Sequence, residues 1–156
     1  DQTFPKDQLS VVSPEYLAKI GIGIEELKKM EMVAILSTTD PYLYRDNLNI
    51  RRVPTGGVKL EPELLLPSIT QGLINVGAIV RDGRTILAVG GRKYLFVYAD
   101  ISTPLVDGTV IRTSQHQYAY FGRECIWILT FSTSSEKILR MSPYFEHMAL
   151  SFKEFE

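Results

Sequence analysis

Side chains able to act as nucleophiles are few, because the chain has one cysteine, Cys125, and two histidines, His116 and His147. A thiol paired with a histidine is a common enzyme nucleophile. Cys125, however, stands in the most apolar segment of the chain, two residues before Trp127. A cysteine in such surroundings usually packs as a small apolar side chain. We therefore expect a structural cysteine and two surface histidines.

Metal-binding and cofactor-binding patterns are equally weak. Metal ligands of small sites recur at short spacing, whereas the two histidines lie far apart in the sequence. The sequence has no Walker loop, nucleophile elbow or H-E-x-x-H segment. Gly90 and Gly91 lack the third glycine and the following helix of a dinucleotide-binding loop, so we expect a hairpin turn there. We expect no metal, no cofactor and no enzymatic activity.

The remaining candidates for chemistry are aromatic and basic. Alternate residues of a strand share one face, which places Arg112, His116, Tyr118 and Tyr120 together if 110–121 is a strand. Tyrosine and arginine are enriched at interface hot spots because they combine apolar area with polar groups. We predict a binding face for a peptide or protein, formed by Arg112, His116, Tyr118, Tyr120, Tyr94 and Tyr98. The alternative is that helices cover these rings as core.

The composition is that of one globular domain spanning residues 1–156, with 45% hydrophobic residues. The 17 basic and 18 acidic residues leave a formal net charge of -1, which gives no drive toward nucleic acid. No apolar run approaches the roughly 20 residues that cross a bilayer. The chain begins at Asp1 rather than methionine, so we expect an encoded upstream segment. A lipid anchor there is the only membrane attachment that we expect.

Apolar periodicity and turn residues predict the elements that must position these side chains. We expect helices over 13–30, 61–76 and 134–148, with an apolar stripe along one side of the last helix that consists of Ile138, Met141, Phe145 and Met148. We expect strands over 32–37, 47–53, 78–80, 85–89, 92–98, 110–121 and 124–131. Asp82-Gly83 and Asp107-Gly108 are typical hairpin turns. The fold class is therefore α+β, an α/β/α sandwich in which helices flank a central antiparallel sheet.

Two prolines bear on the expected helices. An interior proline costs about 3 kcal/mol or more. We therefore expect Pro67 in the first turn of its helix, and a kink or a second helix start at Pro143. Beyond the last helix, Leu150 to Phe152 is expected as a final strand or an extended tail.

The order of these elements resembles that of the PsbP-like superfamily. Asp40-Pro41 ends one strand, the segment Asp46-Asn47-Leu48-Asn49-Ile50 opens the next, and Ser151-Phe152 closes the domain. The superfamily includes the extrinsic PsbP subunit of photosystem II, a small nuclear Ran-binding protein, and DcrB-like bacterial lipoproteins and chaperones. The chain departs from the usual pattern in one respect: Tyr16, not a tryptophan, follows Pro14.

The resemblance covers the chain from about Leu9 to Phe152 and implies a function. It implies a non-enzymatic protein- or peptide-binding or assembly module, part of a secreted or lipid-anchored bacterial protein outside the cytoplasm. Two alternatives are a small-ligand-binding domain or hydrolase that uses His116 with Arg112, and a cytosolic chaperone for a secreted effector. The partner is a protein or peptide in the first and third cases, and nucleic acid in none.

Overall fold

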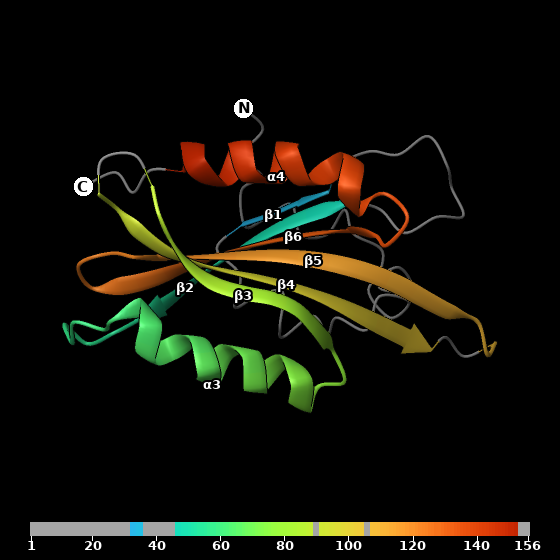
Figure 1. Cartoon of the computed structure of the whole chain (residues 1–156), viewed down its shortest axis with the longest axis horizontal. Coiled ribbons are helices and arrows are strands. Elements are labelled where there is room, and N and C mark those ends of the chain that lie inside the picture. Colours follow the sequence, from blue (N-terminus) through green and yellow to red (C-terminus); the bar gives the residue numbers. More distant parts are fainter. Residues whose placement is uncertain (1–31, 36–45, 89–90, 105–106, 153–156) are drawn as a thin grey trace.

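The computed structural model describes residues 32–35, 46–88, 91–104 and 107–152, with the backbone alone for 32–35. Within them, one antiparallel sheet lies between helix α4 (Ile138–Ser151) on one face and helix α3 (Pro62–Asn75) on the other (Figure 1). The predicted α+β class, with a central antiparallel sheet flanked by helices, is therefore confirmed. The helix expected over 13–30 lies outside the described residues.

The sheet has six strands in the order β1-β2-β6-β5-β4-β3. Their bounds are Met32–Ile35 (β1), Asn47–Pro54 (β2), Ile79–Leu87 (β3), Lys93–Pro104 (β4), Val110–Phe121 (β5) and Cys125–Ser134 (β6). Every pair of neighbours is antiparallel. The last strand, β6, lies between β5 and β2, which leaves β1 and β3 at the edges of the described sheet.

Helix α3 spans Pro62–Asn75, close to the predicted segment. It begins at Pro62, where the missing N–H group costs no helical hydrogen bond. The prediction for Pro67 is wrong, because this residue lies inside the helix and not in its first turn. The oxygen of the Thr70 hydroxyl lies 3.0 Å from the carbonyl oxygens of both Leu66 and Pro67, which share its single hydrogen. A side chain thus supplies a donor to the turn that contains the proline.

Helix α4 spans Ile138–Ser151 and includes Pro143 in one continuous run. The expected strand or tail at its end is wrong for Leu150 and Ser151, which are helical; the chain becomes extended only at Phe152. The apolar stripe of the predicted helix is confirmed, since these residues face the sheet: Ile138, Met141, Phe145 and Met148.

Strand β3 differs from the sequence prediction at its centre. A hairpin turn is expected at Asp82-Gly83, but both residues lie inside one continuous strand. A bulge between Val80 and Asp82 shifts the pairing with β4 by one residue. A Cβ atom at Gly83 would lie 3.3 Å from side-chain atoms of Leu66 and Thr70. Glycine here allows α3 to approach the strand, and it does not make a turn.

The core consists of two apolar clusters, one on each face of the sheet. The cluster under α4 is mostly aromatic and contains Tyr94, Phe96, Tyr118, Tyr120, Phe131 and Phe145, with Ile50, Leu129, Ile138 and Ala149. The cluster under α3 is smaller and aliphatic, with Leu95, Ala119 and Ile126 at its centre. Cys125 is 1% exposed, as expected for a structural cysteine.

The β4–β5 hairpin extends beyond both neighbouring strands (Figure 1). Pairing of β4 with β3 ends at Asp100, and pairing of β5 with β6 ends at Thr113. Residues 102–104 and 110–112 therefore pair across the hairpin only with each other in the described sheet. The turn that joins them contains Asp107 and Gly108, and Gly108 has the positive φ of 82° that a tight turn requires.

Candidate functional site

Strands β4 and β5 carry all six residues of the predicted binding face. The β4–β5 register pairs Tyr94 with Tyr120, Phe96 with Tyr118 and Tyr98 with His116. Directly opposed residues of an antiparallel pair project to the same face. The six residues thus share the face that α4 covers, together with Phe96.

The burial of these residues argues against an exposed face. Tyr94, Tyr118 and Tyr120 are 1–2% exposed and His116 is 6% exposed, because α4 lies over them. The expectation of a surface His116 is therefore wrong. Tyr98 is half-buried and Arg112 is exposed. A binding role for the buried four stays a prediction, and it would require α4 to move.

His116 is enclosed by aromatic rings. Its ring centroid lies 5.0 Å from that of Phe96, 5.1 Å from Tyr98, 6.4 Å from Tyr118 and 6.0 Å from Phe145. Its Nδ1 atom is buried without a hydrogen-bond partner. Burial lowers the pKa of His116 to about 4, although the Asp82 carboxylate opposes this effect. A hydrolase base needs access to a substrate, which these rings deny while α4 is in place.

The tyrosine hydroxyls of the covered face are anchored or shielded rather than reactive. The Tyr120 hydroxyl donates to the carbonyl oxygen of Ala149 in α4 at 2.5 Å. Burial raises the pKa of Tyr120 to about 12, and the neighbouring Tyr94 ring adds to this rise. Burial also raises the pKa of Tyr118, with a further contribution from Glu146. These hydroxyls stay protonated near neutral pH and so supply no nucleophile, and the Tyr120 hydroxyl links β5 to α4.

Arginine side chains cover the margin of the aromatic cluster. The guanidinium carbon lies 5.2 Å above the Phe96 ring for Arg84, 4.7 Å above the Tyr120 ring for Arg92, and 5.9 Å above the Trp127 ring for Arg52. A guanidinium within about 6 Å of an aromatic face is attracted by the ring quadrupole. The three arginines therefore pack over rings at the margin of the cluster.

Arg112 lies apart from the rings, on the projecting end of the β4–β5 hairpin. Its side chain is exposed, and its carbonyl oxygen accepts a hydrogen bond from the Ser135 amide at 3.2 Å. Nearby, the Ser114 hydroxyl and the Arg81 guanidinium both donate to Asp100. Burial alone would raise the pKa of Asp100, but these bonds hold it below its ordinary value. The network fixes the base of the hairpin.

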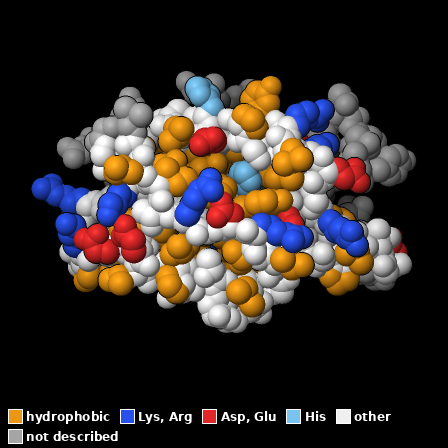
Figure 2. All heavy atoms as spheres, in the orientation of Figure 1, with side chains coloured by type: hydrophobic (Ala, Val, Ile, Leu, Met, Phe, Trp, Pro, Cys, Tyr) orange, Lys and Arg blue, Asp and Glu red, His pale blue; other side chains and the backbone are white. Residues whose placement is uncertain are grey.

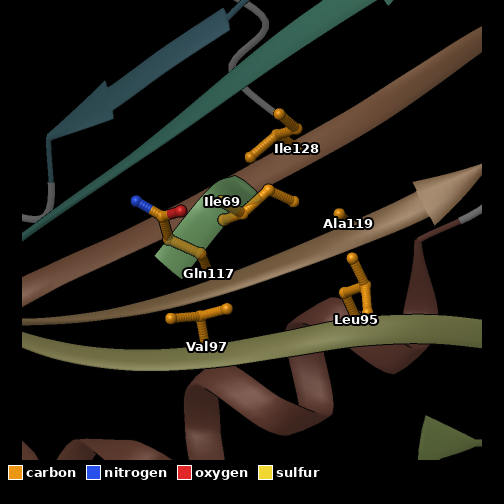
Figure 3. Close-up of a pocket in the computed structure, with 6 residues that line it drawn as sticks. All are labelled: Ile69, Leu95, Val97, Gln117, Ala119 and Ile128. Atoms are coloured by element: carbon orange, nitrogen blue, oxygen red, sulfur yellow. The ribbon is translucent and has the colours of Figure 1, made fainter. Parts of the chain in front are cut away.

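A small hollow lies on the opposite side of the sheet, between α3 and the strands (Figure 3). It is lined by Ile69, Leu95, Val97, Gln117, Ala119 and Ile128. Its volume of about 20 Å³ holds little more than one water molecule. Gln117 is the single polar side chain in this lining, so the hollow is a packing gap and no substrate pocket. The small-ligand alternative thus gains no support from it.

The outer side of α4 is more apolar than a solvated helix face needs to be. Leu139 is 87% exposed, Tyr144 63% and Leu150 50%. Pro143 is also exposed, and helical spacing places it between Leu139 and Leu150 on the same side of the helix. Sequence reasoning considered only the inward stripe of this helix. The signal it missed was leucine at two positions, 139 and 150, that helical spacing places on one side of the helix, away from the stripe that contains Phe145.

Charges gather along the β3 edge. Figure 2 shows a band of basic and acidic side chains across the middle of the molecule, in the view where β3 lies at the near edge of the sheet (Figure 1). Two ion pairs belong to this edge, Arg81 with Asp100 and Arg84 with Asp82, both at 2.7 Å. Within the described part of the chain, no cluster of three or more possible metal ligands occurs. No described helix is long and apolar enough to span a bilayer.

Comparison with known proteins gives a fold and no closer relation. No family model matches the sequence, and no curated protein matches it. Among solved structures, the chain is similar to PA94 of Pseudomonas aeruginosa, a protein of unknown function suggested to be a regulator. The match has a TM-score of 0.58 at 13% identity, and it covers 80% of this chain and 82% of PA94.

A second solved structure is also similar. It is the cyanobacterial PsbP protein (CyanoP) of Synechocystis, with a TM-score of 0.52 at 13% identity, and the match covers 80% of this chain and 81% of CyanoP. At such identity the likeness concerns the fold alone. The element order expected from the sequence and the two structural matches agree: this chain has the PsbP-like fold.

Proposed function

We propose that the chain is a non-enzymatic module that binds an apolar segment of a protein partner through the outer face of α4. The observation that carries this proposal is the exposure of Leu139 and Leu150 on the same side of the helix, at 87% and 50%. Pro143 lies between the two leucines on this side, and a continuous apolar strip rimmed by polar side chains is typical of interaction sites. Here the rim consists of Arg140, Glu146 and His147, all exposed.

The rigidity of α4 supports this role. The helix is anchored by the Phe145 ring in the core and by the hydrogen bond from Tyr120 to Ala149. A rigid helix presents its outer side chains in a fixed arrangement, which reduces the entropy lost on binding. The aromatic residues that sequence reasoning assigned to the binding face thus support a surface on the other side of the helix that covers them.

A non-enzymatic role is supported by the surroundings of the residues considered for catalysis. Cys125 is buried and His116 is enclosed by rings. Neither offers a substrate the approach that nucleophilic or acid–base chemistry needs. The two structurally similar proteins, a suggested regulator and a PsbP protein, are in keeping with this role.

A site-specific crosslinking experiment tests the proposal. A photoreactive amino acid replaces Leu139 in one variant and Leu64 of α3 in another, since Leu64 is similarly exposed, at 77%. Both variants are expressed in the native host and irradiated. We expect one defined adduct from position 139, lost on adding Leu150→Asp, and none from position 64. Equal labelling at the two positions, or an adduct indifferent to Leu150→Asp, contradicts the proposal.

We also propose that the domain works outside the cytoplasm. The support is the PsbP-like fold, which the sequence resemblance associates with extrinsic proteins and lipoproteins. Protease added to intact cells and to spheroplasts of the native host tests this directly. Digestion of the protein in either preparation, while a cytoplasmic marker stays intact, is expected. Protection in both preparations favours the alternative of a cytosolic chaperone.

A further inference from the structure

Strand β3 has an edge that is complementary to itself. The amide of Ala88 donates to the carbonyl oxygen of Arg92 at 2.9 Å, which makes this a hydrogen-bonded pair. Such pairs alternate along an antiparallel ladder, so Ile86, Arg84 and Asp82 also direct their backbone groups toward β4. The backbone groups of Gly83, Thr85 and Leu87 consequently point away from the sheet. They form a row of donors and acceptors to which no strand of the described sheet is paired.

The charges along this row favour one register. Opposed residues of an antiparallel pair share a face. A two-fold axis between two copies of β3 must therefore pass between one residue and the same residue of the second copy, and this residue is called the centre of the pairing. Centring on Gly83 places Asp82 opposite Arg84 of the second copy, and the reverse. Centring on Arg84 or on Asp82 places like charges together, which is destabilising. Centring on Thr85 leaves both charges opposite apolar residues.

The bulge extends the match in the same register. On the β4 side, Arg81 is skipped and Ile79 pairs with Asp100. If the same skip applies on the outer side, Ile86 lies opposite Ile79 of the second copy, and both project to the α4 side of the sheet. Ile79 is 56% exposed, and nothing in the described chain covers it well. Pairing therefore joins apolar residues outside the charged centre.

We propose that the chain forms a two-fold symmetric dimer in which the β3 edges pair antiparallel about Gly83 and make one continuous sheet. Charges on an edge strand usually discourage pairing with other chains. Here Asp82 and Arg84 form a pair within one copy at 2.7 Å, and in the dimer the two pairs combine into an alternating array of four charges. A strand pair of this length is a small interface, so we expect dissociation in the micromolar range.

Charge exchange tests the register. Sedimentation of the purified chain is measured over a concentration series, alone and with single and double substitutions. We expect Arg84→Asp and Asp82→Arg each to weaken the dimer at least tenfold, because each creates four like charges at the centre. The double variant Asp82→Arg/Arg84→Asp is expected to dimerise again. Lys59→Asp, a charge reversal at an exposed loop residue, serves as the control and leaves the dimer unchanged.

Amide hydrogen exchange provides a second measurement that does not depend on substitutions. At high protein concentration the amides of Gly83, Thr85 and Leu87 are expected to gain protection. Those of Arg84 and Ile86, already bonded to β4, are expected to change little. A monomer at all concentrations, a double variant that stays monomeric while folded, or protection that does not alternate overturns the proposal. The experiment uses no other partner, so its outcome is independent of the binding surface on α4.

Discussion

The ring of Phe145 in α4 stacks on the ring of Phe131 in β6, with the centroids 5.0 Å apart and an angle of 23° between the planes. Both side chains are 0% exposed. Offset stacking of this kind is a preferred geometry of aromatic pairs. The two rings join the helix to the centre of the sheet, next to His116, whose centroid lies 6.0 Å from that of Phe145.

Phe145→Ala is expected to lower the free energy of unfolding by about 3 to 5 kcal/mol, the usual cost of removing a buried phenyl ring. The measurement is urea unfolding followed by the fluorescence of Trp127. Leu139→Ala on the outer side of the same helix is the matched control, and we expect a change within about 0.5 kcal/mol there. Similar losses from the two substitutions would mean that α4 is not anchored through its inner face.

The pH dependence of stability is expected to report His116. Its pKa is lowered to about 4 in the folded protein and is about 6.5 when unfolded. Between pH 4 and pH 6.5, His116 is therefore protonated in the unfolded chain and neutral in the folded chain. The contribution of His116 to the free energy of unfolding is fully present above pH 6.5. It is lost as the pH falls toward 4, by up to about 1.4 kcal/mol per pH unit.

Comparison of variants isolates this contribution. Urea midpoints at pH 7 and pH 5 are measured for the protein, for His116→Phe and for His147→Gln. We expect His116→Phe to flatten the pH dependence in this window. The exposed His147 is the control, and its replacement is expected to leave the slope as it is. An unchanged slope in His116→Phe would show that other groups cause the loss of stability.

The sequence predicts the alternation within strands better than it predicts what covers them. The face shared by His116, Tyr118 and Tyr120 follows from a period of two, and the structure has it. Whether that face is exposed to solvent depends on α4, whose apolar stripe around Phe145 could pack against either side of the sheet. Both sides of the sheet carry apolar residues, so local pattern does not choose between them.

The local errors have a similar origin in tertiary packing. Asp82-Gly83 has the composition of a hairpin turn, but Gly83 gives room to the side chains of Leu66 and Thr70 in α3, which is close in space only after folding. Pro67 is tolerated in the interior of α3 because the packing of the helix outweighs one lost hydrogen bond. Apolar periodicity identifies the buried stripe of α4, but it gives no reason to expect a function for Leu139 and Leu150 on the outer side.

Tyr120→Phe is expected to cost about 0.5 to 1.5 kcal/mol, because it removes a buried hydrogen bond between β5 and α4, while the carbonyl oxygen of Ala149 keeps its bond from the Phe152 amide. The ring and its contact with Arg92 are retained, so the change isolates the hydrogen bond. Tyr144→Phe, at an exposed position of α4, is the control and is expected to be nearly neutral. Unfolding in urea gives the free energy of unfolding of each variant. Equal losses in Tyr120→Phe and Tyr144→Phe would show that the hydrogen bond from Tyr120 does not stabilise the position of α4.

Pro67→Ala is expected to raise the free energy of unfolding by about 1 kcal/mol. Alanine restores an amide that can donate to the Glu63 carbonyl oxygen four residues earlier, and it removes the steric penalty of an interior proline. The gain is smaller than the roughly 3 kcal/mol of isolated helices, because proline also restricts the unfolded chain. Pro67 is exposed, so no core contact is lost with the ring.

Pro62→Ala is the matched control for that substitution, because Pro62 stands at the start of the same helix, where an amide gains no helical acceptor. Pro62 is also buried, so its removal is expected to be neutral or destabilising. Urea midpoints of the two variants should therefore move apart. If Pro67→Ala instead lowers the midpoint, the ring at position 67 stabilises α3 through packing, and the lost hydrogen bond is of minor consequence.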